Sequence, residues 1–591
     1  MTRMSKFRGA SALVGLTVAS LVIASVPSVA LSSAAWNDTE WASGIQGTGP
    51  GIGVLDCDPA TNFSTRGEGT LLGGSVLATD LDTLVGLTDM LVTNNGTVSD
   101  PDPNPPLSTQ GSSPDEYYSP LGVTALSAIS VNVTPLSIPL GQPVGVLNQY
   151  AEAESNGQSA GAASGIVNNE GAIDVTQTPP GPGLPTFATF GLSSFLGNLG
   201  ITGVSNLSDL SLELGVLGSS ATLDACESMW DGDVYANLVR SYYIAGLEAN
   251  IASPLVASLN TTATTAVTGV QTAVNGLAGN AGLIAALETA VLGQLDDLPI
   301  VGLLLDNPEA TITATIDLTA VNSLITTPIE DAGGIVSIDL AAGTITVNIA
   351  ELFDSVNGLN NQLPNTQILI NDAVINALVA AVSTALTQWT ANLQAQLNLA
   401  LSLVAVDVAV DLDVVGLAEI TVNAEASLAA LLNGTADLTV DVNCFLVGTC
   451  GVVDALVDSV MNLGEDALSL LLYNTINPVL TTAVGTTVSS LATSLPLITA
   501  PLVTLLSQVL LPLFGQSSLL SLVVNAQNAP NPPGDPAHPE PTWGALPGPT
   551  ASPWQSGRYD VAAMRIVILG AVGTGVALNI ARSSVGSNGP N

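Results

Sequence analysis

Cationic side chains are almost missing from the body of this chain, and their scarcity limits what the chain can bind. The 591 residues include 49 Asp and Glu but only 8 Lys and Arg. Between residues 35 and 557, Arg66 and Arg240 are the only basic residues. Nucleic-acid binding and binding to an anionic lipid surface both need clustered Lys and Arg. The sequence therefore excludes both kinds of partner.

The remaining composition indicates a folded protein with a large core. Hydrophobic residues make up 47% of the chain, whereas aromatic residues make up 4% and charged residues 10%. Disordered chains are poor in apolar residues, and 591 residues are enough for two or more domains. We therefore expect a multi-segment globular protein whose acidic surface keeps it soluble.

The amino terminus has the pattern of a secretory signal. Arg3, Lys6 and Arg8 precede an uncharged, mostly apolar run over 10–26. Small residues follow, and we expect cleavage between Ala34 and Ala35, with cleavage after Ala30 as the alternative. A retained membrane anchor is a second alternative, because the apolar run is at the short end for a membrane span.

The four cysteines, Cys57, Cys226, Cys444 and Cys450, all follow this signal. Their number is even, and bridges form in oxidising compartments. The short Cys444–Cys450 interval favours a local bridge, which leaves Cys57 and Cys226 for a long-range bridge. Two other pairings are open, and a zinc site is disfavoured because CxxC spacing is absent.

Composition and periodicity divide the chain into five segments. We expect a signal peptide at 1–34, a β-rich region at 35–232 and an α+β core at 233–527. A Pro-rich linker at 528–558 and a β-hairpin-like module at 559–591 follow. The predicted fold class is α+β, with antiparallel sheets and long apolar helices.

Within the core, the clearest helix is predicted over 371–401, where Pro and Gly are absent and apolar residues recur on one face. The run 234–298, with Pro254 at a first-turn position, has wide helical patches. Alternating residues predict strands at the following positions: 310–318, 335–340, 344–349, 404–414, 418–424 and 436–442.

The longest uncharged stretch extends over 467–534. Residues 452–525 within it have a helical composition, and 502–524 are long enough to cross a membrane. Polar residues interrupt this run and no Lys or Arg flanks it. We therefore expect a buried helical hairpin at 502–524. The run 566–581 is predicted to form strands, with a tail anchor as the alternative.

Catalytic chemistry is poorly supported by the residues present. The single histidine, His538, lies in the Pro-rich linker, so neither a serine nor a cysteine nucleophile has a positioned base. Two carboxylates suffice for a glycosidase, and the densest aromatic-acidic cluster runs from Trp230 to Tyr243. We therefore predict no enzyme, no catalytic or cofactor-binding residue and no resident metal. Calcium held by carboxylate pairs such as Asp411 and Asp413 is the open alternative.

Several stretches resemble the choice-of-anchor G family. They are AWNDTEW at 35–41, YAEAE at 150–154, SAGAASGIV at 159–167, GAI at 171–173, YDVAAMR at 559–565 and SVG at 584–586. The resemblance implies a surface protein of a Gram-positive actinobacterium with no established biochemical activity. The sequence LPGPT at 546–550 departs from the sortase motif that some members carry, which argues against covalent wall attachment.

Together these features predict an exported, non-enzymatic structural or adhesive protein, either secreted or retained non-covalently at the cell surface. Its partner is an unidentified surface or extracellular molecule. The alternatives are an exported carbohydrate-active enzyme that uses carboxylates and a calcium-dependent binding module. The first requires two carboxylates beside an aromatic platform.

Overall fold

The structure of this chain is a computed structural model, and its compact unit extends from Leu55 to Asn591. The residues that it describes are 63–76, 79–80, 89–120, 136–137, 148–164, 167–173, 186–193, 196, 201, 205–231, 235, 237–277, 284–285, 305–414, 418–427, 437–444, 485–518, 520–528, 558–568 and 576–590. The predicted signal, its cleavage site, Cys57, Cys450 and residues 529–557 of the linker predicted at 528–558 lie outside these residues.

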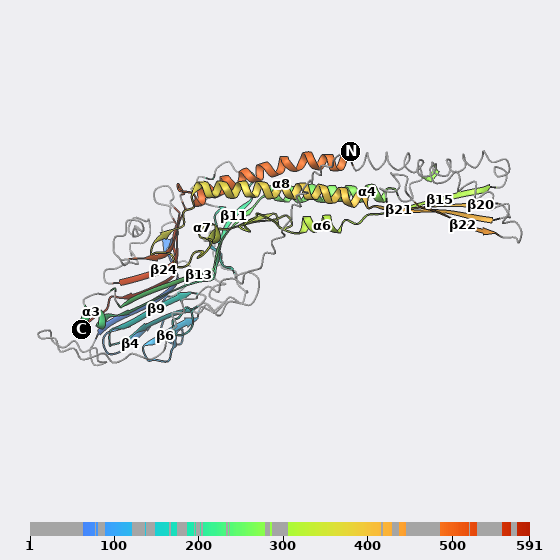
Figure 1. Cartoon of the computed structure of the whole chain (residues 1–591). Helices are drawn as coiled ribbons and strands as arrows, with labels where there is room; N and C mark the ends of the chain where they lie inside the picture. Colours follow the sequence, from blue (N-terminus) through green and yellow to red (C-terminus); the bar gives the residue numbers. More distant parts are fainter. Residues whose placement is uncertain are drawn as a thin grey trace, which may run out of the picture. The chain divides into compact units, whose positions relative to one another are not determined.

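Four sheets contain the described strands, and every pairing between those strands is antiparallel (Figure 1). The nine-stranded sheet has the order β19-β23-β24-β25-β1-β3-β4, and β2 and β26 also pair with β1. Its members are β1 (Phe63–Val76), β2 (Thr79–Asp80), β3 (Met90–Asn94), β4 (Ser99–Asp102), β19 (Thr366–Gln367), β23 (Leu520–Gln527), β24 (Arg558–Ile568), β25 (Val576–Gly586) and β26 (Gly589–Pro590).

The other three sheets are smaller. The six-stranded sheet runs β13 (Leu238–Ile244), β12 (Leu217–Asp224), β9 (Gln158–Ser164), β8 (Asn148–Ala153), β6 (Glu116–Pro120) and β5 (Thr109–Gln110). The seven-stranded sheet runs β16 (Ile329–Glu330), β17 (Val336–Asp339), β18 (Thr344–Asn348), β14 (Leu247–Ala252), β11 (Asp209–Gly215), β10 (Thr186–Gly191) and β7 (Leu136–Ser137). The four-stranded sheet runs β15 (Leu305–Thr315), β20 (Ala405–Val414), β21 (Ala418–Ser427) and β22 (Asp437–Cys444).

The described helices are α3 (Ala225–Asp231), α4 (Pro254–Asn275), α6 (Thr319–Thr326), α7 (Ile349–Phe353), α8 (Asp372–Ser402) and the helix Gly485–Phe514. The local sequence explains where the long helices begin. Ser253 caps α4 by accepting a hydrogen bond from Leu255 N, with Pro254 in the first turn. Asn371 caps α8 in the same way, and Asp372 adds a favourable negative charge to its first turn.

The nine- and six-stranded sheets form a β-sandwich whose backbones come unusually close together. A Cβ atom added to Gly69 of β1 would lie 2.8 Å from Tyr150 O and closer still to Ala162 O. A Cβ atom added to Gly161 of β9 would likewise lie 2.8 Å from Ser584 O. Glycine is therefore required on both strands, because any larger side chain would hold the sheets apart.

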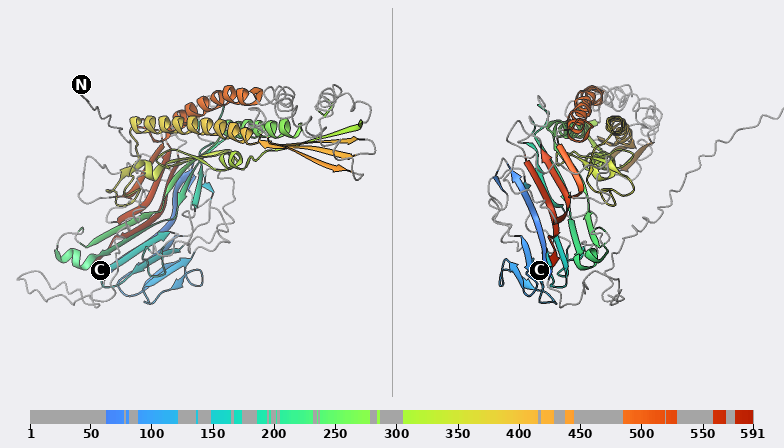
Figure 2. Two further views of the ribbon diagram at one scale, coloured as in Figure 1. Left: turned by 45° about the vertical axis from the view of Figure 1, so that its right-hand side comes forward. Right: turned by 90° about the vertical axis from the view of Figure 1, so that its left-hand side faces the viewer.

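The long helices share one hydrophobic core with the seven-stranded sheet. This core includes Val256 of α4, Leu393 of α8, Leu506 of the helix Gly485–Phe514, Leu212 of β11 and Ile251 of β14. Figure 2 shows the helices running side by side. The Trp389 indole of α8 donates a 2.9 Å hydrogen bond to Leu324 O, which joins α8 to α6.

The structure confirms the predicted fold class, with antiparallel sheets and long apolar helices. The helix predicted at 371–401 is α8, and the hairpin predicted at 335–349 is β17 and β18. The strands predicted at 404–414, 418–424 and 436–442 are β20, β21 and β22. In β20, Val406 and Val408 are buried while Asp407 is exposed, as the alternation predicts.

Two helical predictions are wrong in part. Residues 238–252 form strands β13 and β14, because Leu247, Ala249 and Ile251 enter the core in alternation. The helical hairpin predicted at 502–524 is instead a helix followed by a strand. Gly515 N bonds Leu511 O at the helix end, and β23 then pairs with β24. β-Branched residues at 523 and 524 suit that strand.

The two strands of the predicted carboxy-terminal hairpin, β24 and β25, lie between β23 and β1. Val585 pairs with Gly67, and Ser584 pairs with Glu68. Strands from opposite ends of the described chain are therefore neighbours in one sheet. The division of the chain into five segments stays a prediction.

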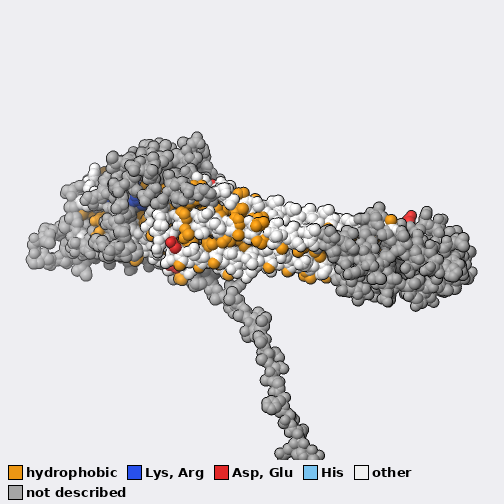
Figure 3. Space-filling view, turned by 90° about the horizontal axis from the view of Figure 1, so that it is seen from above, with side chains coloured by type: hydrophobic (Ala, Val, Ile, Leu, Met, Phe, Trp, Pro, Cys, Tyr) orange, Lys and Arg blue, Asp and Glu red, His pale blue; other side chains and the backbone are white. Residues whose placement is uncertain are grey.

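Two helices, α8 and Gly485–Phe514, are long and apolar enough to cross a membrane by length and composition. Core helices of soluble proteins pass the same test, so this finding alone is weak evidence for a span. Figure 3 looks onto these helices, and the central part of that face shows neutral and hydrophobic side chains with acidic ones near its edges.

Candidate functional site

An acidic hollow of about 440 Å³ opens on the polar face of the seven-stranded sheet. In β11 the leucines at 210, 212 and 214 are buried, so the alternate residues, including Glu213, face away from the core. The same alternation in β14 places Glu248 on this polar face. The hollow is thus a product of strand periodicity.

Two carboxylates lie directly opposite each other in this hollow. Glu213 pairs in register with Glu248, and Glu248 pairs on its other side with Asn348 of β18. Burial raises the pKa of Glu248, and the neighbouring Glu213 raises it further. Like charges at opposed positions destabilise a sheet, so the pair favours any cation that can lie between them.

Helix α7 contributes the opposite wall. Asn348 caps this helix by accepting a 3.1 Å hydrogen bond from Glu351 N, and its amide donates to Glu351 Oε2 at 3.3 Å. Asp354 accepts bonds from Val356 N at 2.9 Å and Asn357 N at 3.1 Å. These backbone donors lower the pKa of Asp354 to about 2, so it stays ionised.

The hollow therefore supplies negative charge and backbone groups, and none of the described residues that line it is aromatic. It lacks the aromatic platform that would favour a carbohydrate-active enzyme. Among the described residues, no group of three or more His, Cys, Asp and Glu is placed to hold a metal ion. The side chain of Asp413, from the pair suggested for calcium, lies outside the described residues.

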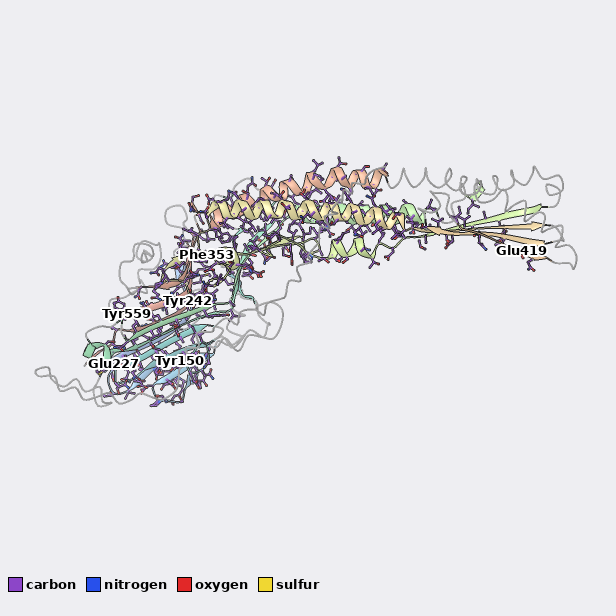
Figure 4. The ribbon with its side chains drawn as sticks, viewed as in Figure 1. Tyr150, Glu227, Tyr242, Phe353, Glu419 and Tyr559 are labelled. Atoms are coloured by element: carbon purple, nitrogen blue, oxygen red, sulfur yellow. The ribbon has the colours of Figure 1, made fainter. Side chains whose placement is uncertain are left out.

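A second acidic cluster lies on strands β6 and β8 of the six-stranded sheet and contains the aromatic ring of Tyr150, which Figure 4 labels. The Tyr150 hydroxyl donates to Glu152 Oε2 at 3.0 Å and lies 3.2 Å from Glu116 Oε1. Glu116 also accepts bonds from Ser112 N and Ser113 N at 2.7 and 3.0 Å. Register places Glu116 directly opposite Glu152.

The aromatic ring of this cluster is buried, whereas Glu116 and Glu152 are half-buried. Tyr150 is 2% exposed, and its ring contacts the turn at Gly171, where even a Cβ atom would not fit. Burial and the neighbouring carboxylates raise the pKa of Glu152 to about 8 and raise the pKa of Tyr150. A protonated Glu152 is an adequate general acid, but the buried ring fills the place that a sugar would need.

A third cluster gathers three of the five described arginines in the β-sandwich. Glu68 of β1 forms ion pairs with Arg66, Arg558 and Arg582, the last at 3.1 Å. Arg558 also contacts Asp560 at 3.3 Å. Burial alone would raise the pKa of Glu68, but the three guanidinium groups hold it well below its ordinary value. The cluster joins β1, β24 and β25.

The long helices, in contrast to this arginine cluster, carry almost no charged side chains. The helices α4, α8 and Gly485–Phe514 contain 22, 31 and 30 residues, and Asp372 is their only charged residue. Many surface hydroxyls bond within their own helix, as Thr384 donates to Ala380 O and Thr504 to Ala500 O. We call the exposed side of α8 and the helix Gly485–Phe514 the uncharged helical face.

The structure partly locates the other predicted site residues. Cys226 at the start of α3 is disulfide-bonded, its partner is not among the side chains that the structure describes, and the described part of the chain has no free cysteine. The predicted pairings therefore stay predictions. In the aromatic-acidic cluster, the Tyr242 hydroxyl donates to Leu359 O at 2.8 Å and Tyr235 contacts the ring of Tyr559. These tyrosines hold the fold together.

Sequence reasoning missed both the acidic hollow and the Glu116–Tyr150–Glu152 cluster. Each depends on register between strands that the sequence does not specify. The only local signal was that acidic residues alternate with apolar ones and share a strand face with polar residues. That pattern is typical of any strand with one face in solvent.

Residues 67–586 match a family described as a domain of unknown function, DUF8394. The chain belongs to this family. No curated protein and no solved structure matches this chain. Membership accounts for nearly all described residues, from β1 to β25, and carries no activity with it.

Proposed function

We propose that this member of the DUF8394 family is an exported structural or adhesive protein of the cell envelope and has no catalytic role. The observation that carries the proposal is the separation of charge. A chain with a formal net charge of −41 presents three long helices with one charged residue among them. Such a surface suits contact with another macromolecule better than chemistry on a small substrate.

The acidic clusters support the same proposal. The described lining of the hollow has carboxylates but no aromatic side chain. In the Glu116–Tyr150–Glu152 cluster the aromatic ring is buried, so it offers no exposed platform. Export is supported by the predicted signal and by the disulfide at Cys226, since such bonds persist in oxidising compartments. The resemblance to choice-of-anchor G proteins supports a proposed site of action at the surface of a Gram-positive cell.

Cell fractionation tests export. The full chain is followed in the medium, a salt wash of the wall, the detergent-extracted membrane and the cytoplasm of its host. We expect it in the medium or the salt wash, starting near Ala35. Recovery in the cytoplasm with residues 1–34 attached would contradict export, and recovery only with detergent would indicate a membrane span.

One further assay with two readouts tests the structural or adhesive role. Purified chain is incubated with isolated wall, where we expect it to sediment with the wall and to release no reducing ends. Release of reducing ends that is lost in both the Glu213→Gln and the Glu152→Gln variants would identify a carboxylate-based enzyme and overturn the proposal.

A further inference from the structure

We infer that the uncharged helical face is the surface through which two copies of this chain associate. The inference rests on the proposed structural role, because it assigns a partner to the same helices. The face is formed by the exposed side chains of α8 and of the helix Gly485–Phe514, which are joined where Gln516 N donates to Asp372 Oδ1 at 3.1 Å.

Apolar side chains remain exposed along this face. Leu497 is 75% exposed, Leu399 is 50% exposed and Val374 is 44% exposed. Val374 and Leu399 are 25 residues apart, which is close to seven helical turns, so both lie on one side of α8. The exposed residues of α8 around them are mostly small, such as Ala377, Ala391 and Ala395.

The hydroxyl groups on this face do little to make it polar. Thr384 and Thr387 donate to Ala380 O and Ser383 O at 3.0 and 2.8 Å, and Thr493 donates to Ser489 O. A threonine that bonds back to its own helix has already used its proton and turns its methyl group toward solvent. The face is therefore more apolar than its composition suggests, and it permits close approach of another helix.

The distribution of charge favours a second copy of this chain as the partner that covers the uncharged helical face. Two chains that each carry a formal charge of −41 repel each other over most of their surface. The helices of this face offer a contact that places almost no charge near the partner's charges. A cationic partner would instead be drawn to the carboxylate-bearing strands, and lipid-binding helices present Lys or Arg beside Trp or Phe, which this face lacks.

The size of the face is adequate for a specific contact. A helix of 30 residues is about 45 Å long and about 10 Å wide. Two such helices side by side present on the order of 900 Å², so a symmetric pair of copies would bury roughly 1,800 Å². Stable interfaces between proteins commonly bury about 1,200–2,000 Å².

The test measures the mass of the full chain, purified from its host, by sedimentation equilibrium over a wide concentration range. We expect a reversible dimer whose fraction rises when NaCl is increased from 50 to 500 mM, because salt screens the repulsion between acidic copies. A monomer at every concentration and salt level would overturn the inference.

Substitutions locate the contact. Ala391→Glu combined with Leu497→Glu places charge at the centre of the face and should weaken dimerisation at least tenfold. The matched control is Val356→Glu, because Val356 is 86% exposed in the loop after α7, and it should leave the dimer unchanged. Equal dimerisation in both variants, each folded by circular dichroism, would place the interface elsewhere and overturn the inference.

Crosslinking detects the dimer directly and does not rely on a substitution that weakens it. A single Ala391→Cys substitution should give a covalent dimer with a short bismaleimide, whereas Val356→Cys should not. A monomeric chain that still sediments with the wall would overturn the inference and leave the proposed function standing. A dimer found only in the cytoplasm would support the inference and contradict the proposed export.

Discussion

The close approach of the two sandwich sheets predicts a large penalty for one added methyl group. In Gly69→Ala the new Cβ atom would lie 2.8 Å from Tyr150 O and closer to Ala162 O. An ordinary contact between carbon and a carbonyl oxygen is about 3.3 Å or more. Both oxygens belong to strand backbones, so neither can rotate away and the sheets must separate locally by about 1 Å.

The cost has two parts. Overpacking of a well-packed core costs about 1–3 kcal/mol. Separation by about 1 Å also removes a quarter to a half of the dispersion energy from neighbouring atom pairs, and for about 20 pairs this adds roughly 1 kcal/mol. We therefore expect Gly69→Ala to lower the free energy of unfolding by about 3 kcal/mol.

Urea denaturation followed by circular dichroism measures this change. With a slope of about 3 kcal/mol per molar urea, the midpoint should fall by about 1 M. The matched control is Gly246→Ala, because no atom lies within 4 Å of its added Cβ. The control should stay within about 0.5 kcal/mol of the wild type. If Gly69→Ala and Gly246→Ala had the same midpoint, the backbone-to-backbone packing of the sheets would be refuted.

Four further predictions concern charge and covalent links. Glu152 has a raised folded-state pKa of about 8, so its stabilising contribution is full below about pH 4.3 and is lost as pH rises to 8; Glu152→Gln should therefore gain about 3–4 kcal/mol over the wild type between pH 5 and pH 8 in urea titrations, and no gain would contradict the raised pKa. Glu68 has a lowered pKa, so its contribution is present above about pH 4.3 and is lost at lower pH; at pH 7, Glu68→Gln should cost about 3–5 kcal/mol by leaving three arginines without their carboxylate, and a neutral substitution would argue against the cluster. Glu248→Gln should raise stability at pH 7 by about 0.5 kcal/mol by relieving repulsion from Glu213, an effect that 1 M NaCl should diminish. Cys226→Ser should cost about 2–4 kcal/mol in thermal or urea unfolding, and peptide mapping without reduction should find Cys57 as the partner of Cys226.

Features that depend on local periodicity were predictable from the sequence. Helix α8 has nine buried residues on one side, no Pro or Gly inside it and a capping Asn371, so one window contains its full signal. The hairpin of β17 and β18 is similarly local, because its strands are joined by a turn at Gly343, where φ is 74°. Each element is encoded within a short segment.

Features that depend on distant pairing were not predictable. Strands β13 and β14 together contain Ala, Leu and Val, as does the helix after them, so composition does not mark the boundary, and burial against distant strands decides the conformation of the strands. The basic residues of the sequence could be counted, but nothing local indicates that Arg66, Arg558 and Arg582 meet at Glu68. The candidate hollow depends on the same kind of register.

The neighbouring positions of β1 and β25 set the order of events during synthesis. Arg66 and Ser584 are hydrogen-bonded at 3.2 Å although 518 positions separate them. A ribosome therefore makes one central strand of the sandwich first and its neighbour among the last. Until residues 576–586 emerge, β1 lacks that partner and the two sheets cannot close. Contacts at such separation make folding slow, so a chain exported as we propose would have time to pass a translocation pore in an extended form.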